Sequence, residues 1–307
     1  MPAQTLGWTP AVVSHTEMFE YGASMCMHAL FVGTPQEYTD SMVLPVSGAP
    51  KLAGIRKEDE AVALPIWNEI LVGIEMIYLR LSPVYWGFGI PPGDGSAVVV
   101  IPAFLMTDLY LTEFRYWINR IGYKAYLSGI GLNAECPNLL IRQKLDATIR
   151  KAYRETGKKV HLVGHSLGGV IARAAASQMP DRVASVITLG SPFRGVSLHR
   201  SILRAAQLVR GQILERHGDG VLPSCYTARC TCNFVESLFG DLPKSVCETA
   251  IYTKSDGIVD WRVCRTGNPD VDFEVSATHI GLAFNPIVFD VVAHRLARQN
   301  PRWGHRA

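Results

Sequence analysis

The sequence predicts an α/β fold, with a mostly parallel central sheet and helices on both of its faces. Short, continuous apolar runs, typical of strands buried on both sides, alternate along the chain with longer segments of helical spacing. Alternation of strands and helices favours parallel pairing with right-handed crossovers. With 307 residues, 48% of them hydrophobic and 19% charged, the chain is long enough for one large domain with insertions.

The expected elements follow one another closely from residue 97 to residue 189. Strands are expected at 97–101, 123–128, 160–163 and 183–189, with helices at about 108–121, 137–156 and 170–179. Gly122 and Gly157 end the first two of these helices. Further strands at 250–254 and 271–275, followed by a closing helix at about 286–299, complete the predicted sheet.

The alternation pauses between about residues 197 and 246, which is too long for an ordinary loop. Because this insertion leaves the sheet at the carboxyl end of a strand, it is expected to form a helical cap over that edge. One side of its first helix would either complete the core or line an acyl pocket; it carries Leu198, Ile202, Ala205, Ala206, Leu208 and Val209. The α/β domain, with this insertion, is expected to span residues 96–307.

Residues 1–95 are expected to form an N-terminal arm with one amphipathic helix. Apolar residues recur at helical spacing at Ile66, Ile70, Ile74, Ile77 and Leu81, and Pro83 ends the segment. This apolar stripe predicts a helix packed on the main domain, and the alternative is an arm that shapes the substrate pocket. Charged residues interrupt the same stretch, so it is not expected to span a bilayer.

Residues 160–169 read V-H-L-V-G-H-S-L-G-G and carry a G-x-S-x-G pattern between a strand and a helix. So tight a turn forces Ser166 into an unfavourable backbone conformation, and side chains at Gly164 and Gly168 would collide with neighbouring backbone. The turn lifts the serine hydroxyl to the amino end of a helix, where developing negative charge is favoured. Ser166 is therefore the candidate nucleophile.

A serine hydroxyl needs a base to remove its proton, and a histidine that a carboxylate holds in the right tautomer suits this role. Three of the nine histidines follow the late strands, at His279, His294 and His305. His294 falls inside the closing helix and His305 in the tail, so His279 is the candidate base. His165, beside the serine, is expected to belong to the scaffold.

The candidate carboxylate is Asp256, which directly follows the expected strand at 250–254. Active sites on open α/β sheets lie at the carboxyl ends of the strands, where Asp256 falls. Asp260 lies deeper in the same loop and is the less favoured alternative. Asp272 and Glu274 fall within the last strand.

On these residues the chain resembles the α/β-hydrolases of the lipase and esterase kind, over roughly residues 97–297. The order serine, aspartate, histidine is typical of that family. The segments that carry the resemblance are 164–169 (GHSLGG), 188–195 (TLGSPFRG), 256–259 (DGIV) and 278–281 (THIG). The resemblance implies an oxyanion hole made by the backbone N–H groups of Phe104 and Leu167. Such lipases usually have His-Gly or Pro-Gly after the first buried strand, whereas this chain has Pro102-Ala103.

The expected function is that of a serine hydrolase that cleaves carboxylic esters, of a small molecule or a lipid, through an acyl-enzyme. Ser166 is expected to attack, His279 to move the proton, and Asp256 to orient His279, with neither metal nor cofactor. A thioesterase, an amidase or an acyltransferase would use the same groups. A non-catalytic binding protein that kept the fold is the alternative from a different class.

Composition argues against several other classes of protein. A net charge of +3 and the lack of a basic stripe argue against nucleic-acid binding. The first Lys or Arg is Lys51, so no positively charged signal region is seen and a cytoplasmic location is expected, with at most transient contact with a lipid surface. The oligomeric state is left open.

The cysteine spacing argues against a structural zinc site. Five of the seven cysteines lie in the late part of the chain, at Cys225, Cys230, Cys232, Cys247 and Cys264, without paired C-x-x-C spacing. A disulfide from the insertion to the acid loop, through Cys264, and a set of reduced thiols are both open at this point.

Overall fold

The computed structural model describes residues 60–227 and 229–298. The chain divides into residues 1–49 and 50–307, and every described residue belongs to the second part. A boundary near residue 95 between an arm and the main domain stays a prediction, because most of the arm lies outside the described residues.

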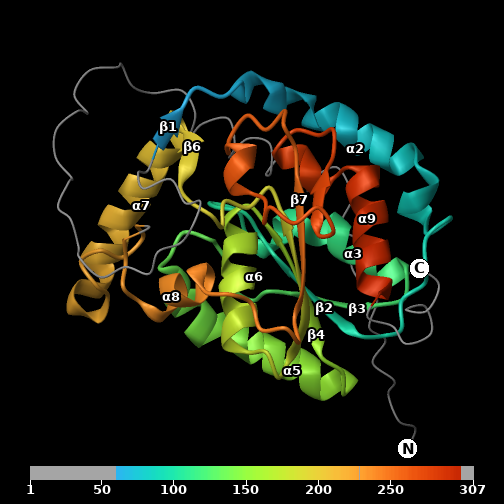
Figure 1. Ribbon diagram of the computed structural model, residues 1–307, viewed down its shortest axis with the longest axis horizontal. Helices are drawn as coiled ribbons and strands as arrows, with labels where there is room; N and C mark the ends of the chain where they lie inside the picture. Colours follow the sequence, from blue (N-terminus) through green and yellow to red (C-terminus); the bar gives the residue numbers. More distant parts are fainter. Residues whose placement is uncertain (1–59, 228, 299–307) are drawn as a thin grey trace, which may run out of the picture. The chain divides into compact units, whose positions relative to one another are not determined.

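A six-stranded, fully parallel sheet organises the described chain, in the order β3-β2-β4-β5-β7-β8 (Figure 1). Its strands are β2 (Ala97–Ile101), β3 (Lys124–Leu127), β4 (Val160–His165), β5 (Val183–Leu189), β7 (Cys247–Tyr252) and β8 (Asp272–Glu274). These are the strands that the apolar runs predict, and the predicted fold class is confirmed. Because all strands run in one direction, the loops after β4, β7 and β8 meet at one edge of the sheet.

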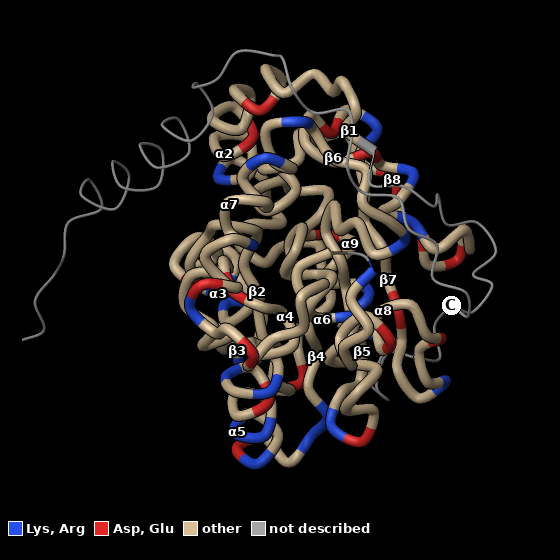
Figure 2. Tube along the Cα trace, turned by 90° about the vertical axis from the view of Figure 1, so that its left-hand side faces the viewer, with Lys and Arg blue, Asp and Glu red and all other residues tan. Residues whose placement is uncertain are grey.

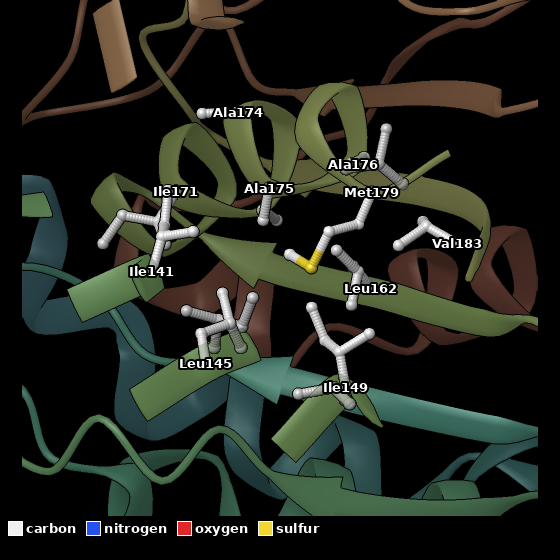
Figure 3. Close-up of a cluster of buried hydrophobic side chains, with 14 of the residues drawn as sticks. Ile141, Leu145, Ile149, Leu162, Ile171, Ala174, Ala175, Ala176, Met179 and Val183 are labelled. Carbon is white, nitrogen blue, oxygen red and sulfur yellow. The ribbon is translucent and has the colours of Figure 1, made fainter. Parts of the chain in front are cut away.

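Helices cover both faces of the sheet. They are α3 (Thr112–Arg120), α4 (Pro137–Leu140), α5 (Asp146–Thr156), α6 (Leu167–Gln178) and α9 (Pro286–Ala297). On β2, Val99 belongs to one core cluster and Val98 and Val100 to the other, as expected from the alternation of side chains along a strand. The first cluster joins the sheet to α5 and α6 (Figure 3), and the second joins it to α3 and α9.

The insertion at 197–246 comprises β6 (Ser197–His199), α7 (Arg200–His217), a short 3-10 turn (Gly218–Gly220) and α8 (Asn233–Phe239). Helix α8 packs on α6 and buries Phe234 and Leu238 in the core, so this part completes the domain instead of capping it. Helix α7 buries Val209 and Ile213 beside Phe104, whereas Leu208 is 72% exposed. The predicted apolar side of α7 is therefore only partly buried.

The described part of the arm comprises β1 (Glu60–Val62), which pairs with β6, a 3-10 helix η1 (Ile66–Leu71), α2 (Val72–Leu81) and a second 3-10 turn η2 (Pro83–Trp86). A helix is present where the spacing predicts one, but the apolar stripe faces outward: Ile70 is 85% exposed and Ile74 is 65% exposed. The opposite side packs on the core through Val72, Met76 and the buried Leu79. Which face packs was thus predicted wrongly, because spacing shows which residues share a face but not which face meets a neighbour.

Positions of Lys or Arg and of Asp or Glu are intermixed along α5 and the turns near it (Figure 2). Among the described residues, no helix combines the length and the apolar character that crossing a membrane requires.

Candidate active site

Ser166 lies in the turn that joins β4 to α6, with φ 52° and ψ −123°. This is a strained conformation for a residue with a side chain, and such strain is concentrated at functional sites. The turn is tight because its glycines are close to other backbone: a Cβ on Gly164 would overlap the Gly168 carbonyl, and one on Gly168 would overlap the carbonyl of Ile101. The Ser166 N–H donates to Leu189 O on β5 (2.8 Å), which fixes the turn against the sheet.

Asp256 and His279 meet in the loops that follow β7 and β8. The His279 Nδ1–H donates to Asp256 Oδ2 at 2.7 Å, and both side chains are buried. The other oxygen of Asp256 accepts the N–H groups of Ile258 (2.9 Å) and Val259 (2.7 Å). Asp260 instead caps the next 3-10 turn, where its Oδ1 accepts the Arg262 N–H (3.0 Å). Of the two aspartates in this loop, Asp256 is the one that contacts His279.

His279 lies against the end of β5, the strand between those that lead to Ser166 and Asp256. A Cβ on Gly190 would be 3.1 Å from His279 Nδ1. The His165 Nε2–H donates to His279 O (2.9 Å), so the residue before the serine holds the histidine backbone. Within the described residues, no hydrogen bond joins Ser166 Oγ to His279. Such bonds are often long in the absence of substrate and tighten in the reacting complex.

The surroundings of the two histidines push their pKa values in opposite directions. Burial disfavours imidazolium at His279, but the Asp256 carboxylate outweighs it and raises the pKa above the ordinary 6.5. Burial lowers the pKa of His165 to about 3, so His165 is a neutral part of the scaffold at ordinary pH. His279 is thus the histidine of this pair that can exchange a proton near neutrality.

Leu167 directly follows Ser166, and Phe104 lies in the loop after β2, whose Pro102 carbonyl approaches Gly168. Within the described residues, neither the Phe104 N–H nor the Leu167 N–H donates a hydrogen bond. Leu167 is the first residue of α6, and the first N–H groups of a helix have no acceptor within that helix. The loop after β2 is constrained: Leu105 has φ 60°, in the left-handed region that a leucine rarely adopts. An alanine at position 103, where the resemblance expects glycine, is buried in this loop without a positive φ.

Asn133 is a buried side chain that holds this loop and that the sequence pattern does not single out. Its side-chain Nδ2 donates to Pro102 O (2.8 Å). Its backbone carbonyl accepts the Leu105 N–H (3.0 Å), and its backbone N–H donates to Met106 O (2.9 Å). The loop that carries the Phe104 N–H is therefore bonded on both sides to one residue. Asparagine in a loop is common, so the sequence alone offers no signal for this role.

Two carboxylates of the arm reach the loops that carry Asp256 and His279. Glu69 accepts backbone N–H groups from both loops, and Glu75 accepts from Thr278. Neither glutamate follows a strand of the sheet or belongs to a motif that would single it out in the sequence.

The cysteines give no sign of a disulfide through Cys264. Cys136, Cys225, Cys230, Cys232 and Cys264 are free thiols, and Cys264 Sγ is fully buried, 3.8 Å from Asp260 O. Of the two possibilities that the sequence leaves open, reduced thiols are the one that the structure has at these five positions. The part of the chain that the structure describes contains no cluster of three or more candidate metal ligands.

Comparison with known proteins agrees with this architecture. The model of the α/β hydrolase fold family matches residues 155–231. A triacylglycerol lipase of Burkholderia plantarii is 33% identical over 144 residues, which are 44% of this chain and 40% of the lipase. A pimeloyl-[acyl-carrier protein] methyl ester esterase of Aliivibrio fischeri is 31% identical over 116 residues, 37% of this chain and 42% of the esterase. The chain thus spans less than half the length of these relatives.

A solved structure from a study of two metagenome-derived lipolytic enzymes, LipS and LipT, aligns with a TM-score of 0.47 and 14% identity, over 68% of this chain and 96% of that one. The parallel sheet, the strained serine turn and the family match together define an α/β-hydrolase fold. Within that class, the sequence is lipase-like and esterase-like.

Proposed function

We propose that the chain is a serine hydrolase that cleaves carboxylic esters of the lipid or small-molecule kind. The observation that carries this proposal is the buried hydrogen bond between His279 and Asp256, next to the strained turn of Ser166. The similar proteins are named a triacylglycerol lipase and a methyl ester esterase, and both names describe enzymes that act on esters, which supports the choice of reaction.

The geometry supports an acyl-enzyme route. Ser166 Oγ attacks the ester carbonyl carbon while its proton passes to Nε2 of His279, and Asp256 keeps the Nδ1–H in place. The N–H groups of Phe104 and Leu167 donate to the oxyanion of the tetrahedral intermediate, as backbone donors do in such sites. His279 then gives the proton to the leaving alcohol. A water molecule, with His279 again as the base, attacks the acyl-enzyme and releases the carboxylic acid and free Ser166.

The raised pKa of His279 predicts how the rate depends on pH. Only the neutral imidazole is a base, so kcat/KM should be low below the His279 pKa and rise through it, at a pH above the ordinary 6.5. The measurement is kcat/KM for p-nitrophenyl butyrate between about pH 5 and pH 9, corrected for spontaneous hydrolysis. A profile that is flat across this range would contradict His279 as the base.

Part of the insertion is proposed to cap the site and line an acyl pocket. Helix α7 packs beside Phe104 and Leu105 through Val209 and Ile213, next to the proposed oxyanion donors. Because Leu208 is exposed on this helix, its substitution should spare the fold while changing contacts with a long acyl chain. Each buried methylene of substrate contributes up to about 0.8 kcal/mol.

Leu208→Ser should therefore lower kcat/KM for long-chain p-nitrophenyl esters more than for the acetate, with an unchanged melting temperature. Tyr116→Ser is the matched control, since Tyr116 is a large side chain that is 57% exposed on α3. It should affect all chain lengths alike. An equal loss across chain lengths for Leu208→Ser, or a lower melting temperature, would contradict the pocket.

A panel of substrates separates this function from its alternatives. The proposal expects turnover of p-nitrophenyl esters, from acetate to palmitate, well above that of matched anilides and thioesters. Faster turnover of thioesters or anilides would favour a thioesterase or an amidase, and acyl transfer to an added alcohol in preference to water would favour an acyltransferase. Lack of turnover for every class would favour a binding protein.

A further inference from the structure

Glu69 lies in η1, on the side of the arm that faces the catalytic loops, and is only 9% exposed. Its Oε1 accepts the N–H groups of Gly257 (3.1 Å) and His279 (3.0 Å), and its Oε2 accepts the Ile280 N–H (2.8 Å). One buried carboxylate thus binds three backbone donors from two loops. Hydrogen bonds to an ionised acceptor are about twice as strong as neutral ones.

The three backbone donors belong to the loops that carry the candidate acid and the candidate base. Gly257 directly follows Asp256, and His279 and Ile280 belong to the loop of the histidine. Gly257 lies in an irregular loop after β7, whereas His279 directly precedes the 3-10 helix η7 (Ile280–Ala283) after β8, so their separation is not fixed by sheet pairing alone. Glu69 links the backbone of the two loops close to the bond between Asp256 Oδ2 and His279 Nδ1.

The packing around Glu69 leaves little room for another arrangement. A Cβ on Gly257 would lie 2.9 Å from Glu69 Oε1 and 2.8 Å from Pro65 O, so glycine lets the arm approach the acid loop. Glu75, on α2, accepts the Thr278 hydroxyl (2.6 Å) and the Thr278 N–H (3.0 Å), and a Cβ on Gly281 would overlap its carboxylate. Both glutamates therefore contact the segment around His279 from the same arm.

We propose that Glu69 is a positioning residue for the hydrolase: it holds the Asp256 loop and the His279 loop at the spacing that their hydrogen bond requires, and Glu75 secures Thr278 beside them. The proposal rests on the proposed function of Ser166, Asp256 and His279. The arm would then position the catalytic loops as well as cover the core. Small errors in the placement of reacting groups are costly, since a shift of about 1 Å can lower a rate about 10²-fold.

Glu69 also contributes to the charge that His279 meets. In the described part of the chain, Asp256 from the acid loop, Glu69 from η1 and His165 from β4 contact His279. Glu75 from α2 contacts the neighbouring Thr278, and Tyr110 from η3 (Asp108–Leu111) contacts Ile280. His165 is neutral, and the Tyr110 hydroxyl donates to Ile280 O (3.3 Å). The acidic groups favour imidazolium, so removing the Glu69 charge should shift the titration of His279 to lower pH.

Two variants separate the reach of Glu69 from its charge. Glu69→Asp keeps the charge but is one methylene shorter, so it cannot serve both loops; we expect kcat to fall about 10- to 10²-fold with KM little changed. Glu69→Gln keeps the length of the side chain but removes its charge. It also replaces one carboxylate oxygen with an NH2 group, which cannot accept a hydrogen bond from a backbone N–H. We expect a smaller loss of kcat and a midpoint of kcat/KM against pH that moves to lower pH.

Glu113→Gln is the matched control, because Glu113 also ties the arm to the core. Its carboxylate accepts Arg80 Nη2 (2.6 Å) and the Tyr85 hydroxyl (2.9 Å) without touching either loop. We expect a lower melting temperature with normal kcat and pH midpoint. If both Glu69 variants behave like Glu113→Gln, Glu69 is only a structural anchor and the positioning role is wrong.

The wild-type protein separates this proposal from the function on which it rests. A wild type that neither hydrolyses esters nor reacts with a fluorophosphonate overturns the hydrolase itself, whereas an active wild type with unaffected Glu69 variants overturns only the positioning role. Should the variants not fold, amide hydrogen exchange in the wild type decides. Slow exchange at Gly257, His279 and Ile280 supports the role, and exchange as fast as at the amide of Asp181, an exposed residue in the turn before β5, overturns it.

Discussion

Ser166→Ala is expected to lower kcat for ester hydrolysis on the order of 10⁴-fold or more, because it removes the hydroxyl that we propose forms the acyl-enzyme. The fold should survive the change. The turn is held by the Ser166 N–H and by the close approach of Gly164 and Gly168, and none of these contacts involves the hydroxyl. The measurement is kcat for p-nitrophenyl butyrate with protein free of host esterases, next to a melting curve.

Ser191→Ala provides a matched control for this loss. Ser191 is another fully buried serine just beyond a strand of the sheet, and its hydroxyl donates to Leu189 O (3.2 Å). The control should retain activity near that of the wild type. Near-normal turnover in Ser166→Ala would rule out Ser166 as the nucleophile.

Asp256→Asn is expected to cost on the order of 10⁴-fold in kcat, the loss that this change brings in Ser-His-Asp triads. An amide at this position no longer accepts the Nδ1–H of His279 as the carboxylate does, so the ring is left in the wrong tautomer. Asp260→Asn is the control in the same loop. Its carboxylate caps a 3-10 turn through Arg262 and does not contact His279, so the change should mainly lower stability.

The comparison is made at the pH of maximal wild-type activity, with kcat and the melting temperature measured for both variants. A greater loss of kcat in Asp260→Asn than in Asp256→Asn would show that the acid has been misassigned. Equal losses that follow the melting temperatures would mean that the loop acts only through stability.

The sequence could predict features that depend on a short stretch of residues. The run at 160–169 specifies a strand, a turn that only glycines permit, and a helix, and the structure has β4, Ser166 and α6 there. Asp256 and His279 could be selected because parallel strands bring their carboxyl ends to one edge. That reasoning needs only the order of the strands and not their distances.

The residues that the sequence could not predict act across long separations. Glu69 bonds to His279, 210 positions further along the chain, and no periodicity relates the two. The arm also shows the limit of spacing: Ile70 and Ile74 share a face, as expected, but the buried side is that of Leu79. A carboxylate that satisfies backbone donors of a loop can decide such an orientation, and it leaves no apolar signal in the sequence.

The most direct test of the account is the site of covalent modification by a fluorophosphonate. The native protein is treated with the probe, digested, and examined by peptide mass spectrometry, with Ser166→Ala treated in parallel. We expect one adduct per chain, on Ser166, which forms faster as the pH rises through the pKa of His279 and does not form in Ser166→Ala. An unmodified Ser166 in active protein, or an adduct confined to another residue, would contradict it.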